Sequence, residues 1–596
     1  MGAMRRRFGW WLLAALAAVV GVVAVAAVTT WNRRTDVATQ AVQRFLDGAG
    51  LGDARFTIDR IDLTGAHVRD IATADKRVTI EELTLDFSPT VLAARQIDAA
   101  TLVRPRFALG GSGRGDGGIP ALPAWRIDKI TVADGHLVLP GDDGPLDVAL
   151  NGSVALADGM LRNGKLTAVL GGRIAGAARR VTLDVPDFSA TLQGGGVTAQ
   201  LQRARLRARD VAWEAAGIDG TLSWQPGKAR AKLAVSALTS TDGLIVPVKL
   251  AASGALASNR LDFTLAAVAA HGSGKLAVDI AGFHDLARSR GEAKVTVPAL
   301  TFAPGFQPAD LFPSLAGVFG PITGTLSLAG PLDWRDGKVT PDLVLHLADL
   351  GVETAGAALT GFAGDIRLVS LTPPATAPGQ RLHGSVLFGS LPANPAELQF
   401  QLRSDALLGI EAMTLGFGSG ELVAAPFTLD PARPDMATTI TARALDMAAL
   451  FKLADIEGLS GTGRLDGTIP LRAGASGVSI GGGHLGGSEP GGLSLKRDAL
   501  PPALVDAGKD QNVNLVFEAL ENFHYQVLSL DIEQSNSAPD VIRMGLEGAN
   551  PKLLDGHPIR FNIRFESDFD RLTDIALRTM TAARSVLRLA ARSARP

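Results

Sequence analysis

Apolar and polar residues alternate along most of this chain, in short runs that begin and end near glycine. The clearest run is Gly458–Leu471, and a similar phrase occurs at Gly317–Gly330. Side chains with a period of two line opposite faces of a strand, so the pattern predicts half-buried strands separated by glycine turns. In the first phrase Leu465, Ile469 and Leu471 fall on one side, and Arg464, Asp466 and Thr468 on the other; in the second, Leu326 and Leu328 take the apolar side.

A second motif shifts the parity of the apolar residues within one phrase. It occurs at Phe56–Leu63, Val78–Leu85 and Trp125–Val132, where two alternating apolar residues are followed by a charged pair and then by two more apolar residues. A β-bulge would return all four apolar side chains to one face and increase the twist of the strand. An ordinary hairpin turn at the charged pair is the alternative.

Helical spacing is confined to a few short segments. It appears at 36–50, in a single turn at 446–453, at 510–522 and in a basic amphipathic segment at 572–589. A glycine-rich stretch at 481–492 predicts a loop, and strands resume until Arg560–Glu566. The chain is therefore predicted to be mainly β.

The N-terminal region carries no charge between Arg7 and Arg33. The run Phe8–Val28 would extend roughly 32 Å as a helix, which is enough to cross a bilayer core of about 30 Å. The basic cluster Arg5–Arg7 favours a cytoplasmic N-terminus. A cleaved signal peptide ending near Ala24–Ala26 is the alternative, and both interpretations export the remainder of the chain.

The composition of the chain excludes several classes of function. The chain has 58 basic and 60 acidic residues, so it lacks the basic footprint of a nucleic-acid-binding protein, and without cysteine it has neither disulfides nor thiolate sites. The nine histidines show no metal-ligand spacing, and no nucleophile elbow occurs. The glycine-rich segment 110–118 lacks the ending of a phosphate-binding loop, and Asp142 and Asp143 are typical of a turn. We therefore predict that the protein is not an enzyme and has no cofactor and no metal.

The strand pattern continues for roughly 500 residues, whereas a compact sandwich typically ends near 100–150 residues. A long, twisted, antiparallel sheet that forms a groove, with an apolar concave face and a polar convex face, fits this length, and such an apolar face binds something apolar. The residues predicted to line this groove are Leu326, Leu328, Leu465, Ile469, Leu471, Phe561, Ile563 and Phe565.

The last strand is predicted to have a free edge. Its polar side carries Arg560, Asn562, Arg564 and Glu566. Unpaired backbone groups at such an edge invite strand addition from another protein. The alternative is that the segment 572–589 folds back over this edge.

Several segments carry a family resemblance. Leu445–Leu453, Gly458–Leu471 and Ala519–Tyr525, followed by Leu546–Pro551 and Pro558–Ile563, resemble the C-terminal region of YdbH-like proteins, which belong to the AsmA-like, bridge-like lipid-transfer group. The resemblance implies an inner-membrane anchor and a periplasmic β-groove that conducts phospholipid toward the outer membrane. It also implies a small outer-membrane lipoprotein as a partner at the C-terminal end. The rival classes are an assembly factor for outer-membrane proteins and a β-helical adhesin or polysaccharide-acting protein.

We therefore predict a single-pass protein of the inner membrane with its bulk in the periplasm. Its predicted parts are a cytoplasmic tail (1–7), a transmembrane helix (8–31), a linker helix (32–50), a β-groove of repeated strands (51–444), a YdbH-like β region (445–569) and a basic amphipathic helix (570–596).

Overall fold

The computed structural model describes most of residues 53–567. The segments outside the described residues are 1–52, 63, 89, 92–93, 95, 109–125, 140–144, 158–159, 175–176, 194–195, 209–212, 226, 272–273, 318–319, 354–356, 372, 389–390, 431–434, 454–457, 475–476, 497–510, 536–537 and 568–596. The predicted anchor, linker helix, 110–118 loop, Asp142–Asp143 turn and C-terminal helix all lie outside them. Among the described helices, none is long and apolar enough to cross a membrane.

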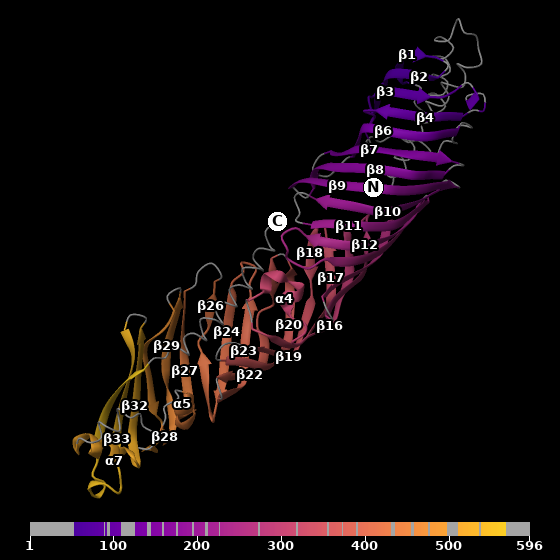
Figure 1. The fold of residues 1–596 in the computed structure, drawn as a ribbon. Helices are drawn as coiled ribbons and strands as arrows, with labels where there is room; N and C mark the ends of the chain where they lie inside the picture. Colours follow the sequence, from indigo (N-terminus) through magenta and orange to yellow (C-terminus); the bar gives the residue numbers. More distant parts are fainter. Residues whose placement is uncertain are drawn as a thin grey trace. The chain divides into compact units, whose positions relative to one another are not determined.

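The chain divides into two units, each built mainly from strands (Figure 1). The first unit contains β1 (Arg55–Ile61), β2 (Gly65–Ala72), β3 (Val78–Asp86), β4 (Gln96–Val103), β5 (Arg106–Ala108), β6 (Arg126–Leu139), β7 (Leu146–Ala157), β8 (Met160–Ile174), β9 (Ala177–Gln193), β10 (Gly196–Ala208), β11 (Trp213–Gln225), β12 (Lys228–Ser240), β13 (Val248–Ala257) and β14 (Arg260–His271). Strands β15 (Gly274–Asp285) and β16 (Arg290–Phe302) contribute residues to both units, as do β14 and β17 (Ile322–Arg335).

The second unit continues through β18 (Lys338–Pro341), β19 (Leu343–Glu353), β20 (Ala357–Leu371), β21 (Pro374–Thr376), β22 (Gln380–Phe388), β23 (Leu391–Leu402), β24 (Leu408–Phe417), β25 (Gly420–Ala424), β26 (Phe427–Leu429), β27 (Met436–Asp446), β28 (Leu459–Thr462), β29 (Arg464–Gly474), β30 (Gly477–Gly487), β31 (Gly491–Leu495), β32 (Phe523–Ser535), β33 (Ala538–Ala549) and β34 (Ile559–Ser567). Its helices are α4 (Pro308–Leu311), η1 (Pro313–Leu315), α5 (Met447–Leu453), α7 (Gln511–Leu520) and η3 (Leu554–Gly556). The predicted helices at 446–453 and 510–522 are confirmed as α5 and α7.

Most neighbouring strands pair antiparallel in sequence order, as a chain of short glycine turns requires. Among the strand pairings that the structure describes, the exception is β6, which runs parallel to β4 and β5, with Ile97 opposite Ile127. The prediction of a mainly β fold with one large, largely antiparallel sheet is therefore confirmed.

The parity shift is a property of continuous strands. In β3, Val78, Ile80, Leu83 and Leu85 are all buried although their spacing changes parity between the second and third residue. In β1, the register against β2 shifts between Ile58 and Arg60, as expected for a bulge. In all three phrases the charged pair lies inside a strand, β1, β3 or β6, so the hairpin alternative is wrong at these pairs.

Bulges recur farther along the sheet, with a shared stabilising contact. The residues Asp134, Arg203 and Ala444 have positive φ, and each donates its backbone N–H to a side-chain oxygen on the neighbouring strand. The acceptors are Asn151 (2.8 Å), Asp219 (2.9 Å) and Asp466 (2.6 Å). A buried or strand-interior N–H without a partner is costly, so these acceptors fix where each strand bends.

The loop predicted at 481–492 is wrong over most of its length, because only 488–490 connect two strands and the rest belongs to β30 and β31. Glycine serves here to let strands approach closely rather than to form a turn. A Cβ on Gly467 would lie 2.0 Å from the carbonyl oxygen of His484 on β30, and one on Gly491 would lie 2.1 Å from that of Thr462. The glycines of this region therefore allow close pairing of neighbouring strands.

Buried apolar residues gather in two large clusters, one in each unit, and in a small cluster of Val185, Ala204, Ala215 and Ile218 on β9–β11. The first joins β1–β7 and includes Leu83, Leu85 and Ile97. The second joins β22–β33 with α5 and α7. In both clusters the apolar side of the sheet is covered by other protein atoms.

Candidate functional site

The strands β10–β14 carry unbroken rows of apolar residues across one side of the sheet. One row is built from Leu222, Ala231, Gly254 and Phe263, which are direct neighbours on β11, β12, β13 and β14. The two rows beside it have the same register. They consist of Gly220, Leu233, Ala252 and Leu265, and of Ile218, Val235, Leu250 and Ala267.

We call the apolar side of β10–β14 the open face. Its large side chains include Leu206, Leu222, Leu233, Leu250, Phe263 and Leu265. The side chain of Leu233 leans along the sheet over Gly220, where a Cβ would lie 2.5 Å from its Cδ2. The residues of the open face thus pack sideways against each other, on the sheet surface.

Part of the open face differs from the two clusters in its exposure. Ala204, Ala215 and Ile218 are buried in a small cluster with Val185, but three leucines of the face are not. Leu206, Leu222 and Leu233 are 37%, 46% and 40% exposed, whereas Leu85 in the first cluster is 0% exposed. Burying a leucine side chain is worth about 1.5–3 kcal/mol, so three leucines left this accessible in adjoining strands form a surface suited to an apolar ligand.

The opposite side of these strands is charged. Arg205, Arg230 and Lys232 are exposed there, and Arg207 pairs with Glu214 at 3.2 Å. The alternation of side chains therefore separates a charged side, which favours water, from the open face. Only one side of this part of the sheet is suited to apolar contact.

The predicted lining residues lie in the second unit or on β17, away from the open face in sequence. Leu326 and Leu328 are half-buried, opposite Leu347 and Leu345 of β19. Leu465 is completely buried in the second cluster, whereas Ile469 and Leu471 are half-buried. Phe561 and Ile563 pack partly buried against the same cluster. The side chain of Phe565 lies outside the described residues.

The predicted partner edge is the outer side of β34. Among the strands that the structure describes, β34 pairs with β33 alone, and Ile563 lies opposite Met544. Arg560, Asn562 and Arg564 are exposed, and Arg560 forms an ion pair with Glu547 of β33. The backbone of Glu566 lies opposite Val541, and its side chain is outside the described part. Partner addition at this edge stays a prediction.

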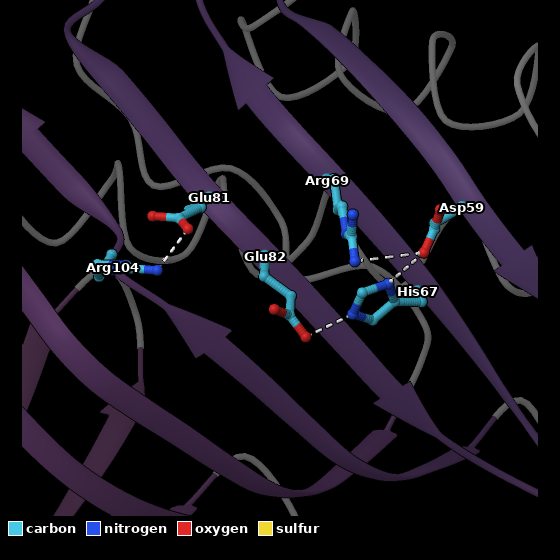
Figure 2. Close-up of polar contacts among 6 residues, drawn as sticks. All are labelled: Asp59, His67, Arg69, Glu81, Glu82 and Arg104. Atoms are coloured by element: carbon cyan, nitrogen blue, oxygen red, sulfur yellow. Dashed lines mark hydrogen bonds and ion pairs between the residues drawn. The ribbon is translucent and has the colours of Figure 1, made fainter.

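A network of charged side chains covers the polar side of β1–β4 (Figure 2). His67 lies between Asp59, at 3.3 Å, and Glu82, to which it is hydrogen-bonded. The hydrogen bond from His67 lowers the pKa of Glu82. Arg69 contacts Asp59 at 3.7 Å. No group in the described residues has the composition of a metal site, and we interpret this network as cross-strand pairing on a solvent-facing surface.

Sequence reasoning missed the open face as a site. The phrase that contains Leu222 shows the same alternation as the phrase around Leu465, so strand parity was available from the sequence. Exposure was not, because it depends on whether other segments cover the strand.

A sheet with a partly exposed apolar side and a charged opposite side defines a class of β-sheet protein with a surface for apolar ligands. The model of one protein family, described as YdbH-like, intermembrane phospholipid transport protein YdbH, matches residues 162–574. The chain therefore belongs to the YdbH-like family of phospholipid transport proteins, and the matched region includes the whole of β10–β14. Neither a curated protein nor a solved structure matches the chain.

Proposed function

We propose that the open face binds the acyl chains of phospholipids, and that the protein carries phospholipids along an apolar groove between the inner and outer membranes of a Gram-negative envelope. The observation that carries this proposal is that Leu206, Leu222 and Leu233 are exposed and surrounded by apolar residues of the open face. Each buried methylene of an acyl chain contributes about 0.8 kcal/mol, so a chain that lies along several strands is held without any specific polar contact. Weak, distributed binding of this kind suits a ligand that must slide.

Site-specific photo-crosslinking tests this function. A photo-crosslinker at Leu222 or Leu233 of the full chain in cells should capture phospholipid, and one at Arg230 or Lys232 should not. These four positions lie on β11 and β12, and Arg230 and Lys232 are the matched controls because they flank Ala231 on the other side of the same strand. Equal capture on both sides would contradict the proposal, and capture of proteins alone would favour an assembly factor. Ile469 and Leu471 are further predicted positions for lipid capture.

We also propose that the segment 8–31 anchors the protein in the inner membrane with its bulk in the periplasm. The support is the uncharged run between Arg7 and Arg33, together with the family membership. N-terminal sequencing of the membrane-extracted protein is the test. A sequence that starts at Ala27 would show that the segment is a signal peptide.

The proposed partner is a small outer-membrane lipoprotein that adds a strand to β34. A row of backbone groups on the outer side of Arg560–Glu566 supports this mode of binding. Crosslinkers placed along this strand in cells should capture a small lipoprotein. Crosslinks to the chain itself alone would favour the fold-back of 572–589.

A further inference from the structure

A polar group interrupts the apolar side of the sheet next to the open face. On β13, on β14 from Leu261 to Ala269 and on β15, the positions on this side are glycine or apolar residues, with the exception of His284. His284 is half-buried and directly precedes Asp285, the last residue of β15. A histidine in this place has lost part of its hydration, so its ring nitrogens need defined partners.

Trp334 of β17 supplies one partner. Its indole Nε1–H donates a hydrogen bond of 2.9 Å to Nδ1 of His284. Because an indole nitrogen is a donor only, Nδ1 must act as an acceptor, and the neutral imidazole then carries its proton on Nε2. The Trp334 contact thus fixes the tautomer of His284 and leaves Nε2–H as a donor.

The geometry makes the two rings one flat surface. Their centroids are 6.1 Å apart and their planes differ by 22°, while the hydrogen bond joins their edges, so the rings lie side by side. The indole lies across β16 at Gly291, where a Cβ would be only 2.4 Å from Cζ2 of Trp334. Any larger residue at this position would displace the indole.

This surface is continuous with the open face. The ring of Phe263, which ends the row that begins at Leu222, lies 6.1 Å from that of Trp334. Aromatic rings with one polar edge, such as indole and imidazole, are suited to the boundary between apolar and polar parts of a lipid. Acyl chains on the open face would therefore bring the polar part of the same molecule close to His284.

We propose that His284, oriented by Trp334, is a headgroup-binding position. Its Nε2–H donates a hydrogen bond to a phosphate or ester oxygen of a phospholipid whose acyl chains lie on the open face. This inference rests on the proposed function, and it adds a polar contact that sets the orientation of the lipid. Such a donor distinguishes a phospholipid from a plain hydrocarbon, which the leucines alone do not.

The test uses the full chain in cells labelled with radioactive phosphate. One photo-crosslinker is placed at Leu261, which is two residues from Phe263 on the same side of β14, and another is placed at Leu222. We expect His284→Phe to lower the phospholipid capture at Leu261 by about fivefold, the factor that one ordinary hydrogen bond contributes. Capture at Leu222 should be unchanged.

Two further variants separate this role from a structural one. His284→Gln keeps an acceptor for the indole and a donor for the lipid, so it should retain capture at Leu261. Trp334→Phe removes the hydrogen bond that orients His284, so it should lower phospholipid capture at Leu261. This variant keeps the inference testable if the His284→Phe protein does not accumulate in cells. The matched control is His346→Phe, because His346 is exposed and pairs with Asp365 at 2.6 Å on the polar side of β19.

The outcomes distinguish this inference from the function on which it rests. Capture at Leu261 that is the same in wild type, His284→Phe and Trp334→Phe would overturn the headgroup position and leave the lipid-binding face intact. Capture at Leu222 without any capture at Leu261 in the wild type would overturn it as well. An absence of phospholipid at Leu222 in the wild type would refute the proposed function itself.

Discussion

A glutamate placed on the open face should stop lipid transfer without unfolding the protein. Leu222 is 46% exposed, so only about half of the 1.5–3 kcal/mol for burying a leucine is at stake, and Leu222→Glu should destabilise β11 by about 1 kcal/mol. Leu465 also lies on the apolar side of its strand, β29, but is 0% exposed. Leu465→Glu puts a carboxylate where water does not reach, at a cost of several kcal/mol, which is a large part of a typical stability of about 5–15 kcal/mol.

The two variants are compared in two assays on the purified full chain. Transfer of a fluorescent phospholipid between donor and acceptor vesicles should fall at least about tenfold for Leu222→Glu, because each 1.4 kcal/mol of carboxylate desolvation along the lipid path is a factor of ten. Hydrogen exchange should remain slow in 213–240 for this variant and become fast in 459–471 for Leu465→Glu. Thr221→Glu is the control, since Thr221 is exposed on the other side of β11. Rapid exchange in 213–240 of Leu222→Glu would show that the face is packed in solution, and wild-type transfer would show that lipid does not use it.

Three further predictions concern stability. Gly463→Ala should destabilise the second unit by more than about 2 kcal/mol in urea denaturation, because Gly463 has a φ of 130° and its Cβ would lie 1.9 Å from Oη of Tyr525; Tyr525→Phe should relieve part of the loss. Asn550→Ala should speed hydrogen exchange in α7, since the buried Asn550 amide donates to the carbonyl of Glu518 at 2.9 Å and its loss costs about 1–3 kcal/mol. Hydrogen bonds from Thr64, with Arg60, lower the pKa of Asp62 from 3.8 to about 2, so the stabilisation of the β1–β2 turn is present above pH 3.8 and is lost as the pH falls toward about 2. Protection of the Thr64 amide across this range, with Asp62→Asn as the control, measures it; equal pH dependence in both proteins would contradict the assignment.

Strand formation and strand parity were predictable from local sequence. Arg464, Asp466 and Thr468 are exposed and Leu465 is buried, as the alternation of β29 predicts. Coverage of a strand was not predictable, because it is decided by distant segments. Leu465 belongs to the same buried cluster as Met447 and Phe451 of α5, whereas Leu222 remains accessible.

Long-range pairing and packing residues were hidden for the same reason. The parallel pairing of β6 with β4 brings Ile127 next to Ile97 across a connection that the local pattern does not describe. The contact between Trp334 and His284 joins residues on β17 and β15, and the space for it depends on the missing side chain of Gly291 on the strand between them. These three residues are far apart in the sequence, and no repeating pattern of apolar and polar positions links them, so the sequence alone does not predict their contact.

The apolar side of a β-sheet is usually covered by a second layer of protein. A second sheet gives a β-sandwich its cover, and in the second unit α5, α7 and neighbouring strands bury the apolar residues. On β10–β12, Leu206, Leu222 and Leu233 keep more than a third of their surface exposed. The opposite side of these strands carries the charges of Arg230 and Lys232, which favour contact with water. In the function that we propose, lipid is the missing second layer. Binding to the folded state then stabilises it by mass action, so the occupancy of the face and the stability of these strands must rise together.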